Sequence, residues 1–392
     1  MKRYLAIIVA ATLILSGCTL SPGDTNTSEP TIHETENTIT TDAPEIETEI
    51  TTQTNDQQSN ATLPMITVSV PVSSEDTTAD DGTVIFRVVK QNMHLVMQDP
   101  DVADRIIVDF LNRIDHVAST HEETLEQAKN AYQPSEVWTP YLCSITYAPT
   151  RIDQTVLSLY GTNVHYTGGA HAVLAPRAAN YNIVTGDVLT LGSIITDANA
   201  VEKLCALTIE NLSAVADEKY LRNGFEETVQ QRFSVEESYD EDWYFTTTGL
   251  CFYFDQYAIA PYSSGVITAE IPYAELTGII DDAFFPPELE ECVGAVLTKP
   301  AEDADMNAFS RISEVIVDTE APMYVIYCEG TIQNLRITLN DAELASGYTL
   351  FASQTLCSSD AIVIQADPNL FHHFEITYDS NGQTYTIPLL AE

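Results

Sequence analysis

The composition of the chain changes abruptly near residue 64, and this change decides which part of it can fold. Between Thr19 and Pro64 there is no Lys, no Arg and no aromatic residue, and Thr, Asn, Ser, Pro and isolated acids dominate. Such a segment buries too little apolar surface to offset the entropy that ordering costs. We therefore expect residues 18–64 to be a disordered acidic Thr-rich linker with a root-mean-square span of about 35–40 Å. A packed fold is expected from residue 65 onward.

The chain begins with the organisation of a bacterial lipoprotein export signal. Lys2 and Arg3 precede a short apolar run, which ends in Leu15-Ser16-Gly17-Cys18, the small-residue pattern that signal peptidase II cuts before a lipidated cysteine. The run is shorter than the roughly 20 apolar residues that a spanning helix needs, which disfavours an uncleaved anchor. We predict a signal peptide over residues 1–17 and lipidation of Cys18. The lipid would tether the protein to the outer face of the cytoplasmic membrane.

The charge balance restricts the partners. The chain has 16 Lys and Arg residues against 58 Asp and Glu residues, a net charge of -42. This balance argues against nucleic acid and anionic lipid surfaces as partners, because both bind clustered Lys and Arg. The acidic field favours cationic partners and speeds their encounter. The alternative is that the charge serves only solubility.

Seven cysteines are present, and the lipid would occupy Cys18. The other six permit disulfides in an exported protein without requiring them. Cys328 and Cys357 both lie in the last segment and are the favoured pair, while buried thiols in a reducing habitat are the alternative. No CxxC or Cys/His spacing indicates a zinc site, and we expect no metal and no cofactor.

Hydrophobic periodicity predicts an α+β domain over residues 65–299, with a mostly antiparallel sheet and helices packed on it. Met65–Val70 and Thr83–Met97 alternate apolar and polar residues around Asp80-Asp81-Gly82, and together predict a hairpin. Further strands are expected at 141–147, 155–166, 243–247, 250–254 and 266–271, with a hairpin at 179–190. Helical spacing predicts helices at 101–132, 197–216, 225–233 and 273–284.

A second folded part is expected after a polar linker at Pro300–Asp305. Residues 306–392 contain seven short alternating segments, and Ser380-Asn381-Gly382 is a hairpin turn signal between the last two. This spacing predicts a small all-β sandwich domain, with its own core and separable from the first part.

Two segments stand out as candidate binding elements. The first is Tyr166-Thr167-Gly168-Gly169-Ala170-His171, in which a strand runs into paired glycines that adopt positive φ or allow close backbone approach. The second is the run Tyr257-Ala258-Ile259-Ala260-Pro261-Tyr262-Ser263-Ser264-Gly265, which follows an aromatic strand. The structural alternatives are a glycine bulge, a hydrogen-bonded structural histidine and tyrosines that face solvent.

These two motifs resemble the extracellular domain shared by RsiV-type anti-sigma factors, which sense lysozyme, and by the N-terminal region of PdaC-type peptidoglycan deacetylases. The resemblance covers about residues 65–287 and implies an α+β fold with an exposed binding face that grips lysozyme. Carried over to this sequence, it implies that Tyr257, Pro261 and Tyr262, with Tyr166, Gly168, Gly169 and His171, bind the ligand. The lipoprotein signal excludes direct sigma-factor inhibition, and residues 306–392 lack a deacetylase metal motif.

The sequence therefore predicts a binding protein and not an enzyme, with a cationic protein such as lysozyme as its partner. A peptidoglycan-binding module is the first alternative. A cell-wall-modifying hydrolase is the second, and it would need paired carboxylates in a cleft, which sequence alone does not bring together. No catalytic residue is assigned.

Overall fold

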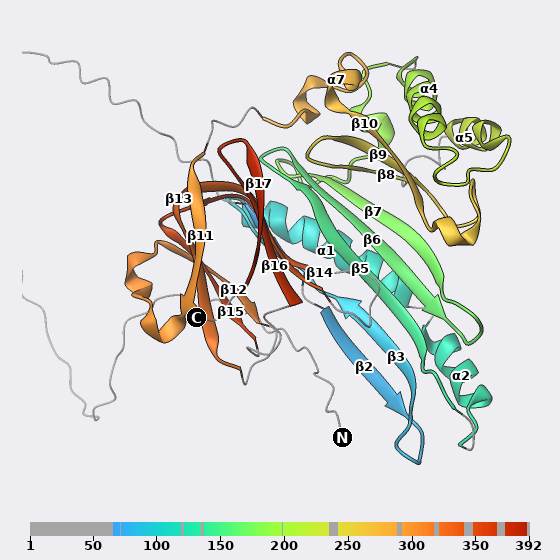
Figure 1. Cartoon of the computed structure of the whole chain (residues 1–392), viewed down its shortest axis with the longest axis horizontal. Coiled ribbons are helices and arrows are strands. Elements are labelled where there is room, and N and C mark those ends of the chain that lie inside the picture. The colour runs from blue at the N-terminus through green and yellow to red at the C-terminus, as the bar shows by residue number, and fades with distance from the viewer. Residues whose placement is uncertain are drawn as a thin grey trace, which may run out of the picture. The chain divides into compact units, whose positions relative to one another are not determined.

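The computed structural model describes residues 66–70, 72–118, 121–134, 137–197, 199–234, 242–287, 292–316, 321–340, 348–366 and 373–389. The predicted signal peptide, Cys18 and the linker lie outside these residues. All the described residues belong to one compact unit, an α+β fold built on three sheets (Figure 1). None of the helices in this part of the chain is both long and apolar enough to span a bilayer.

A five-stranded sheet runs in the order β2-β3-β5-β6-β7. Its strands are β2 (Val72–Thr78), β3 (Val84–Gln91), β5 (Tyr141–Ile152), β6 (Val156–Tyr166) and β7 (Val173–Asn182). All neighbours pair antiparallel except β3 and β5, which run parallel. Gln91 extends the parallel pair, since its buried amide bonds the backbone N–H and C=O of Tyr147.

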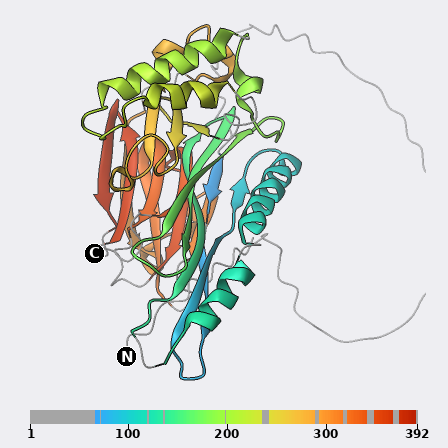
Figure 2. The ribbon, with the colours of Figure 1, turned by 90° about the vertical axis from the view of Figure 1, so that its right-hand side faces the viewer.

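Helices α1 (Pro100–Ala118) and α2 (His121–Ala131) lie alongside this sheet, in teal in Figure 2. The helical spacing of apolar residues predicted here is confirmed on α1, because Ile106, Phe110 and Ile114 are buried in the core. The single helix predicted over 101–132 is instead two helices.

The N-terminal hairpin differs from the prediction. The turn at residues 80–82 is confirmed, but the strand that pairs with β3 is β2. The segment around 65–70 forms β1 (Thr67–Ser69), which pairs with β4 (His94–Val96) on one edge and with β14 (Tyr348–Cys357) on the other.

A three-stranded sheet in the order β10-β9-β8 carries the second motif. It consists of β8 (Trp243–Phe245), β9 (Gly249–Phe254) and β10 (Ile267–Pro272), and packs with α3 (Leu191–Ile194), α4 (Asn199–Ala214) and α5 (Phe225–Phe233). Asp197 caps α4 by accepting from the backbone N–H groups of Asn199 and Ala200. The helix predicted over 273–284 is only α7 (Tyr273–Leu276) and the 3-10 turn η2 (Asp282–Phe284), because Gly278 adopts φ 71° between them.

The remaining strands form a nine-stranded sheet organised around one long strand, β13 (Met323–Leu339). Successive parts of β13 pair with β14 and β15 (Asp360–Gln365), and likewise with β16 (Phe374–Ser380) and β11 (Gly294–Pro300). The strands with a single neighbour are β12 (Arg311–Ile316), β17 (Gln383–Pro388), β4 and β11. The predicted turn at 380–382 is confirmed, with positive φ at Asn381 and Gly382.

The sheet topology does not follow the predicted boundary between two separable domains. Strands β1, β4 and β11 come from the expected first domain, yet they belong to the sheet of the expected second one. The segment predicted as a linker is structured: the 3-10 turns η3 (Ala301–Asp303) and η4 (Met306–Ala308) bring Ala301, Ala304 and Met306 against Val325 and its neighbours. Residues 300–305 therefore do not separate two cores.

Candidate functional site

The paired glycines form the tip of the β6–β7 hairpin. Gly168 and Gly169 have φ angles of 86° and 105°, which residues other than glycine rarely adopt. A Cβ at Gly168 would also lie 3.1 Å from the hydroxyl oxygen of Tyr141. The Tyr166 hydroxyl donates to the carbonyl of Gly169 at 3.2 Å and closes the turn. The glycines are thus required by the backbone, and the segment 167–171 is exposed.

The second motif forms the loop between β9 and β10. Ile259 and Ala260 are buried and fix this loop to the core, whereas Tyr257 is 51% exposed. Pro261 has φ -69° and leads directly into the 3-10 turn η1 (Tyr262–Ser264). Tyr257 has φ 68°, an uncommon conformation for a bulky side chain.

The structure brings the two motifs together. The rings of His171 and Tyr262 stack with centroids 3.8 Å apart, and Tyr257 lies 5.6 Å from Tyr262 between ring centroids. We call His171, Tyr257 and Tyr262 the tyrosine–histidine cluster. The Tyr262 hydroxyl donates to the carbonyl of Ala172 at 3.0 Å, so Tyr262 also joins the two loops.

Two residues that sequence reasoning missed belong to this surface. The side-chain oxygen of Gln256 accepts from the backbone N–H of Leu174 at 3.3 Å, a second bond between the loops. Val173 is 61% exposed and follows directly on the residue that Tyr262 bonds. Gln256 directly precedes the run Tyr257–Gly265, and Val173 lies two residues beyond His171, but neither residue type marks a contact by itself.

Tyr166 and the glycines contact a different group of rings. Tyr166 lies 6.2 Å from Tyr141 between ring centroids, Tyr141 stacks on Trp138 at 5.1 Å, and Trp138 meets Tyr132 at 5.4 Å. These rings are partly buried on a small core beneath α2. The predicted site residues therefore divide, with His171, Tyr257 and Tyr262 in one cluster and Tyr166 in the other.

Buried polar groups hold the three-stranded sheet on the five-stranded one, which is why the two loops meet. Ser158 on β6 donates to the side chain of Asn180 at 2.6 Å and accepts from the N–H of Phe245 at 2.9 Å. Asn180 on β7 in turn donates to the carbonyl of Trp243 at 2.9 Å. These bonds satisfy polar groups that would otherwise be costly to bury.

A group of buried side chains lies at the same junction. Tyr160, Tyr244, Tyr253 and Cys251 pack together, with Tyr160 stacked on Tyr244 at 4.5 Å. Burial raises the pKa of Tyr160 to about 12 and that of the Cys251 thiol to about 11. These groups are neutral at physiological pH and act as core.

None of the six cysteines from Cys143 onward forms a disulfide in this structure. Cys328 is buried, its Sγ donates to the carbonyl of Leu356 at 3.3 Å, and burial raises its pKa to about 12. Cys328 and Cys357, the favoured pair, form no disulfide in this structure, and their pairing stays a prediction. His373 lies just before β16, and His372 lies outside the described residues.

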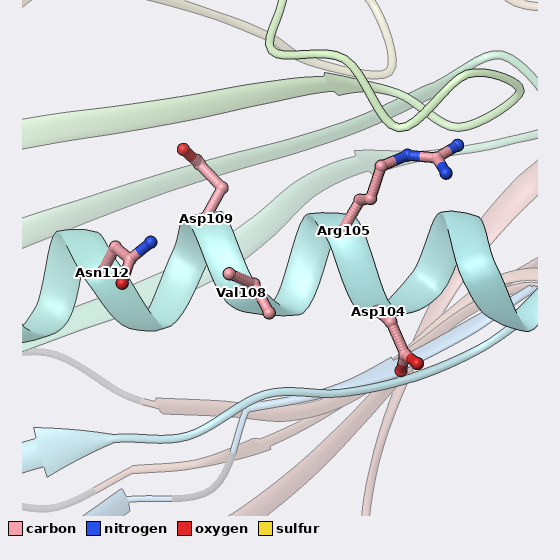
Figure 3. Close-up of a pocket in the computed structure, with 5 residues that line it drawn as sticks. All are labelled: Asp104, Arg105, Val108, Asp109 and Asn112. Atoms are coloured by element: carbon pink, nitrogen blue, oxygen red, sulfur yellow. The ribbon is translucent and has the colours of Figure 1, made fainter.

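The surface of α1 has a shallow, open depression, away from both motifs. It is lined by Asp104, Arg105, Val108, Asp109 and Asn112 (Figure 3). Arg105 and Asp109 are already engaged, with the carbonyl of Thr185 and with Arg113 respectively. In the part of the chain that the structure describes, no three His, Cys, Asp or Glu side chains converge as metal ligands.

Residues 193–274 match the family profile described as "Protein of unknown function (DUF3298)". This stretch contains the loop of Tyr257 and Tyr262. Two solved DUF3298 proteins are similar to the chain. One, from Bacteroides fragilis NCTC 9343, is 18% identical with a TM-score of 0.38. The match covers 55% of this chain and 94% of that protein. The other, from Pseudomonas aeruginosa PAO1, is 16% identical with a TM-score of 0.40. The match covers 56% of this chain and 98% of that protein. A search of the curated proteins found no match.

Proposed function

We propose that this protein is a lipid-anchored, extracytoplasmic binding protein, which uses the tyrosine–histidine cluster to bind a cationic protein such as lysozyme at the cell envelope. It acts by binding and not by catalysis. The resemblance of the two motifs to the RsiV-type and PdaC-type extracellular domain motivates the choice of lysozyme.

The observation that carries the proposal is the meeting of the two motifs in one cluster, in which His171 and Tyr257 are exposed and Tyr262 is partly buried. His171 and Tyr262 stack at 3.8 Å, and the loops are joined by the Tyr262 hydroxyl and by Gln256. A surface that is held in place before binding loses little entropy when a partner docks. Exposed aromatic side chains on such a rigid base are the usual hot spots of protein interfaces.

The charge supports the choice of a cationic partner. Residues 65–300 contain 35 acidic residues against 12 Lys and Arg residues. Lysozymes of the common animal type are cationic, so the two fields attract each other and raise the association rate. Salt screens this attraction, and binding should weaken as the ionic strength rises.

The test is a titration of residues 65–392 with lysozyme by calorimetry, at low and at moderate salt, together with an assay of muramidase inhibition. Tyr257→Ala should weaken binding by about 2 kcal/mol if Tyr257 is a hot spot. The matched control is Tyr385→Ala, another half-exposed tyrosine, on β17 of the nine-stranded sheet, which should leave the affinity unchanged. If neither heat nor inhibition appears at low salt, lysozyme is wrong and wall glycan becomes the leading ligand.

The anchor is tested separately. Cys18→Ala should release the protein from the membrane fraction or leave it as an unprocessed precursor, because signal peptidase II needs the cysteine. A variant of unchanged mature size that still sediments with the membrane would contradict lipid anchoring.

A further inference from the structure

A second exposed tyrosine lies in an unusual backbone conformation, in the segment between α4 and α5. Tyr220 has φ 54° and is 72% exposed. Its side chain makes no hydrogen bond and no ring contact with other described residues. Bulky residues at positive φ are outliers that cost stability, and such residues are concentrated at functional sites. Tyr220 and Tyr257 are the only tyrosines with positive φ in the described part of the chain.

The segment of Tyr220 is joined to the segment of Tyr257. The backbone N–H of Arg222 donates to the carbonyl of Ile259 at 2.8 Å. Each tyrosine stands two residues before one partner of this bond. Leu221 and Ala258 also pack, partly buried, against the same core.

This connection limits the distance between the two tyrosines. Two residues of extended chain span about 7 Å, so the two Cα atoms lie within about 20 Å of each other. A standard protein interface covers about 800 Å² on each partner, which corresponds to a patch about 30 Å across. Both tyrosines therefore fit within one interface.

From this geometry we propose that Tyr220 is a second contact residue of the binding surface, and that a cationic protein partner contacts the α4–α5 segment together with the tyrosine–histidine cluster. This inference rests on the proposed function. Tyr220 lies outside the two motifs.

The charges beside the two tyrosines fit the same partner. Asp217 and Glu218 are exposed on the α4–α5 segment, and Asp255 is exposed two residues before Tyr257. Lys219 pairs with Glu218 at 3.3 Å. Arg222 is the exception, an exposed cation without an ion pair among the described residues, and it serves as a probe of the partner's charge.

The experiment uses residues 65–392 and hen-type lysozyme, with binding kinetics and thermal unfolding measured on the same samples. Tyr220→Asn removes the ring but keeps a residue that tolerates the left-handed conformation. We expect the affinity to fall about tenfold while the Tm is unchanged or higher by about 2 °C. Tyr220→Phe, which keeps the ring, should retain most of the affinity. Tyr385→Ala again controls for loss of a distant tyrosine.

Arg222→Gln removes a charge and keeps the backbone N–H that bonds Ile259. If the partner is cationic and docks here, its association rate constant should rise about twofold at low salt, and this rise should vanish at high salt. An unchanged or lower rate would place the docked protein elsewhere.

The outcomes separate the two proposals. If Tyr257→Ala weakens lysozyme binding and Tyr220→Asn does not, the extension to Tyr220 is wrong and the proposed function stands. If the wild-type protein binds no lysozyme at low salt, both are overturned. A fall in affinity accompanied by a lower Tm in Tyr220→Asn would indicate a structural role and would also overturn the inference.

Discussion

Cys251 shows how burial of a single side chain makes stability depend on pH. It lies with Tyr244 and Tyr160 between two sheets, and burial raises its pKa from 9.0 to about 11. The folded protein therefore holds this proton more tightly than the unfolded chain does. The resulting stabilisation is complete below the unfolded pKa of about 9 and is lost as the pH rises through about 11.

We predict that the free energy of unfolding stays level up to about pH 8.5 and falls above about pH 9. A two-unit shift corresponds to about 2–3 kcal/mol from Cys251 alone. Urea unfolding at pH 7, 9 and 10.5 measures this change. Cys251→Ala should be less stable at pH 7, because it leaves a small cavity, but should lose less stability between pH 9 and 11. Equal losses in variant and wild type would show that Cys251 does not contribute.

Tyr220 and Tyr262 show the limit of sequence reasoning at this scale. The two motifs identified Tyr262, His171 and Tyr257, because glycine and proline loops between aromatic strands are recognisable patterns. The stack of His171 on Tyr262 joins residues from different loops, and no periodicity encodes it. Tyr220 has no sequence signal at all, because nothing in its residue type or its neighbours predicts a positive φ.

At the scale of elements, Arg151 holds β5 against the segment that follows β10. Its guanidinium is 1% exposed, pairs with Asp153 at 2.5 Å, and donates to the hydroxyl of Tyr273 at 2.7 Å and the carbonyl of Phe284 at 2.6 Å. It also lies over the ring of Phe245 at 5.0 Å. The buried carboxylate of Asp153 also accepts from the backbone N–H groups of Thr155 and Val156. Nη2 of Arg151 is buried without a hydrogen-bond partner among the described residues.

We predict that Arg151→Met destabilises the protein by about 3 kcal/mol, since it leaves a buried carboxylate without its counter-ion. The control is Arg87→Met, which breaks a bidentate pair with Asp76 whose side chains are 31% and 32% exposed. That change should cost less than about 1 kcal/mol. Urea unfolding followed by fluorescence compares the two variants. Equal losses would mean that burial of the Arg151 pair adds nothing.

The elements themselves were predictable to the extent that their signals are local. Residues 225–233 form α5 with the predicted bounds, and Asn381-Gly382 supplies the positive φ angles of a hairpin turn. The single helix over 101–132 was wrong because periodicity continues across Ser119-Thr120, two residue types that favour a helix N-cap over a helix interior. Segment 65–70 was assigned to the wrong hairpin because its partner β14 lies far along the chain.

At the scale of the whole molecule, strands from the N-terminal part of the chain pair with strands from the C-terminal part. This pairing decides which segments fold as one unit. β1 pairs with β14 through Val68 and Ala352, and both side chains are buried in the core under α1. β11 pairs with the first half of β13 over seven residues, from Gly294 to Pro300. Arg336 on β13 further donates to the carbonyl of Thr150 on β5 at 2.6 Å. A cut near residue 305 would separate all of these partners.

We therefore predict that residues 306–392 expressed alone do not unfold cooperatively, whereas residues 65–392 unfold in one transition. The fragment would leave unpaired the backbone groups of β13 that bond β11 and those of β14 that bond β1. Restoring β11 in residues 292–392 should recover part of the structure, which makes it the matched control. Circular dichroism during thermal unfolding and dispersion of amide proton resonances are the measurements. A fragment 306–392 with dispersed resonances and the full-length midpoint would show that the C-terminal strands fold alone.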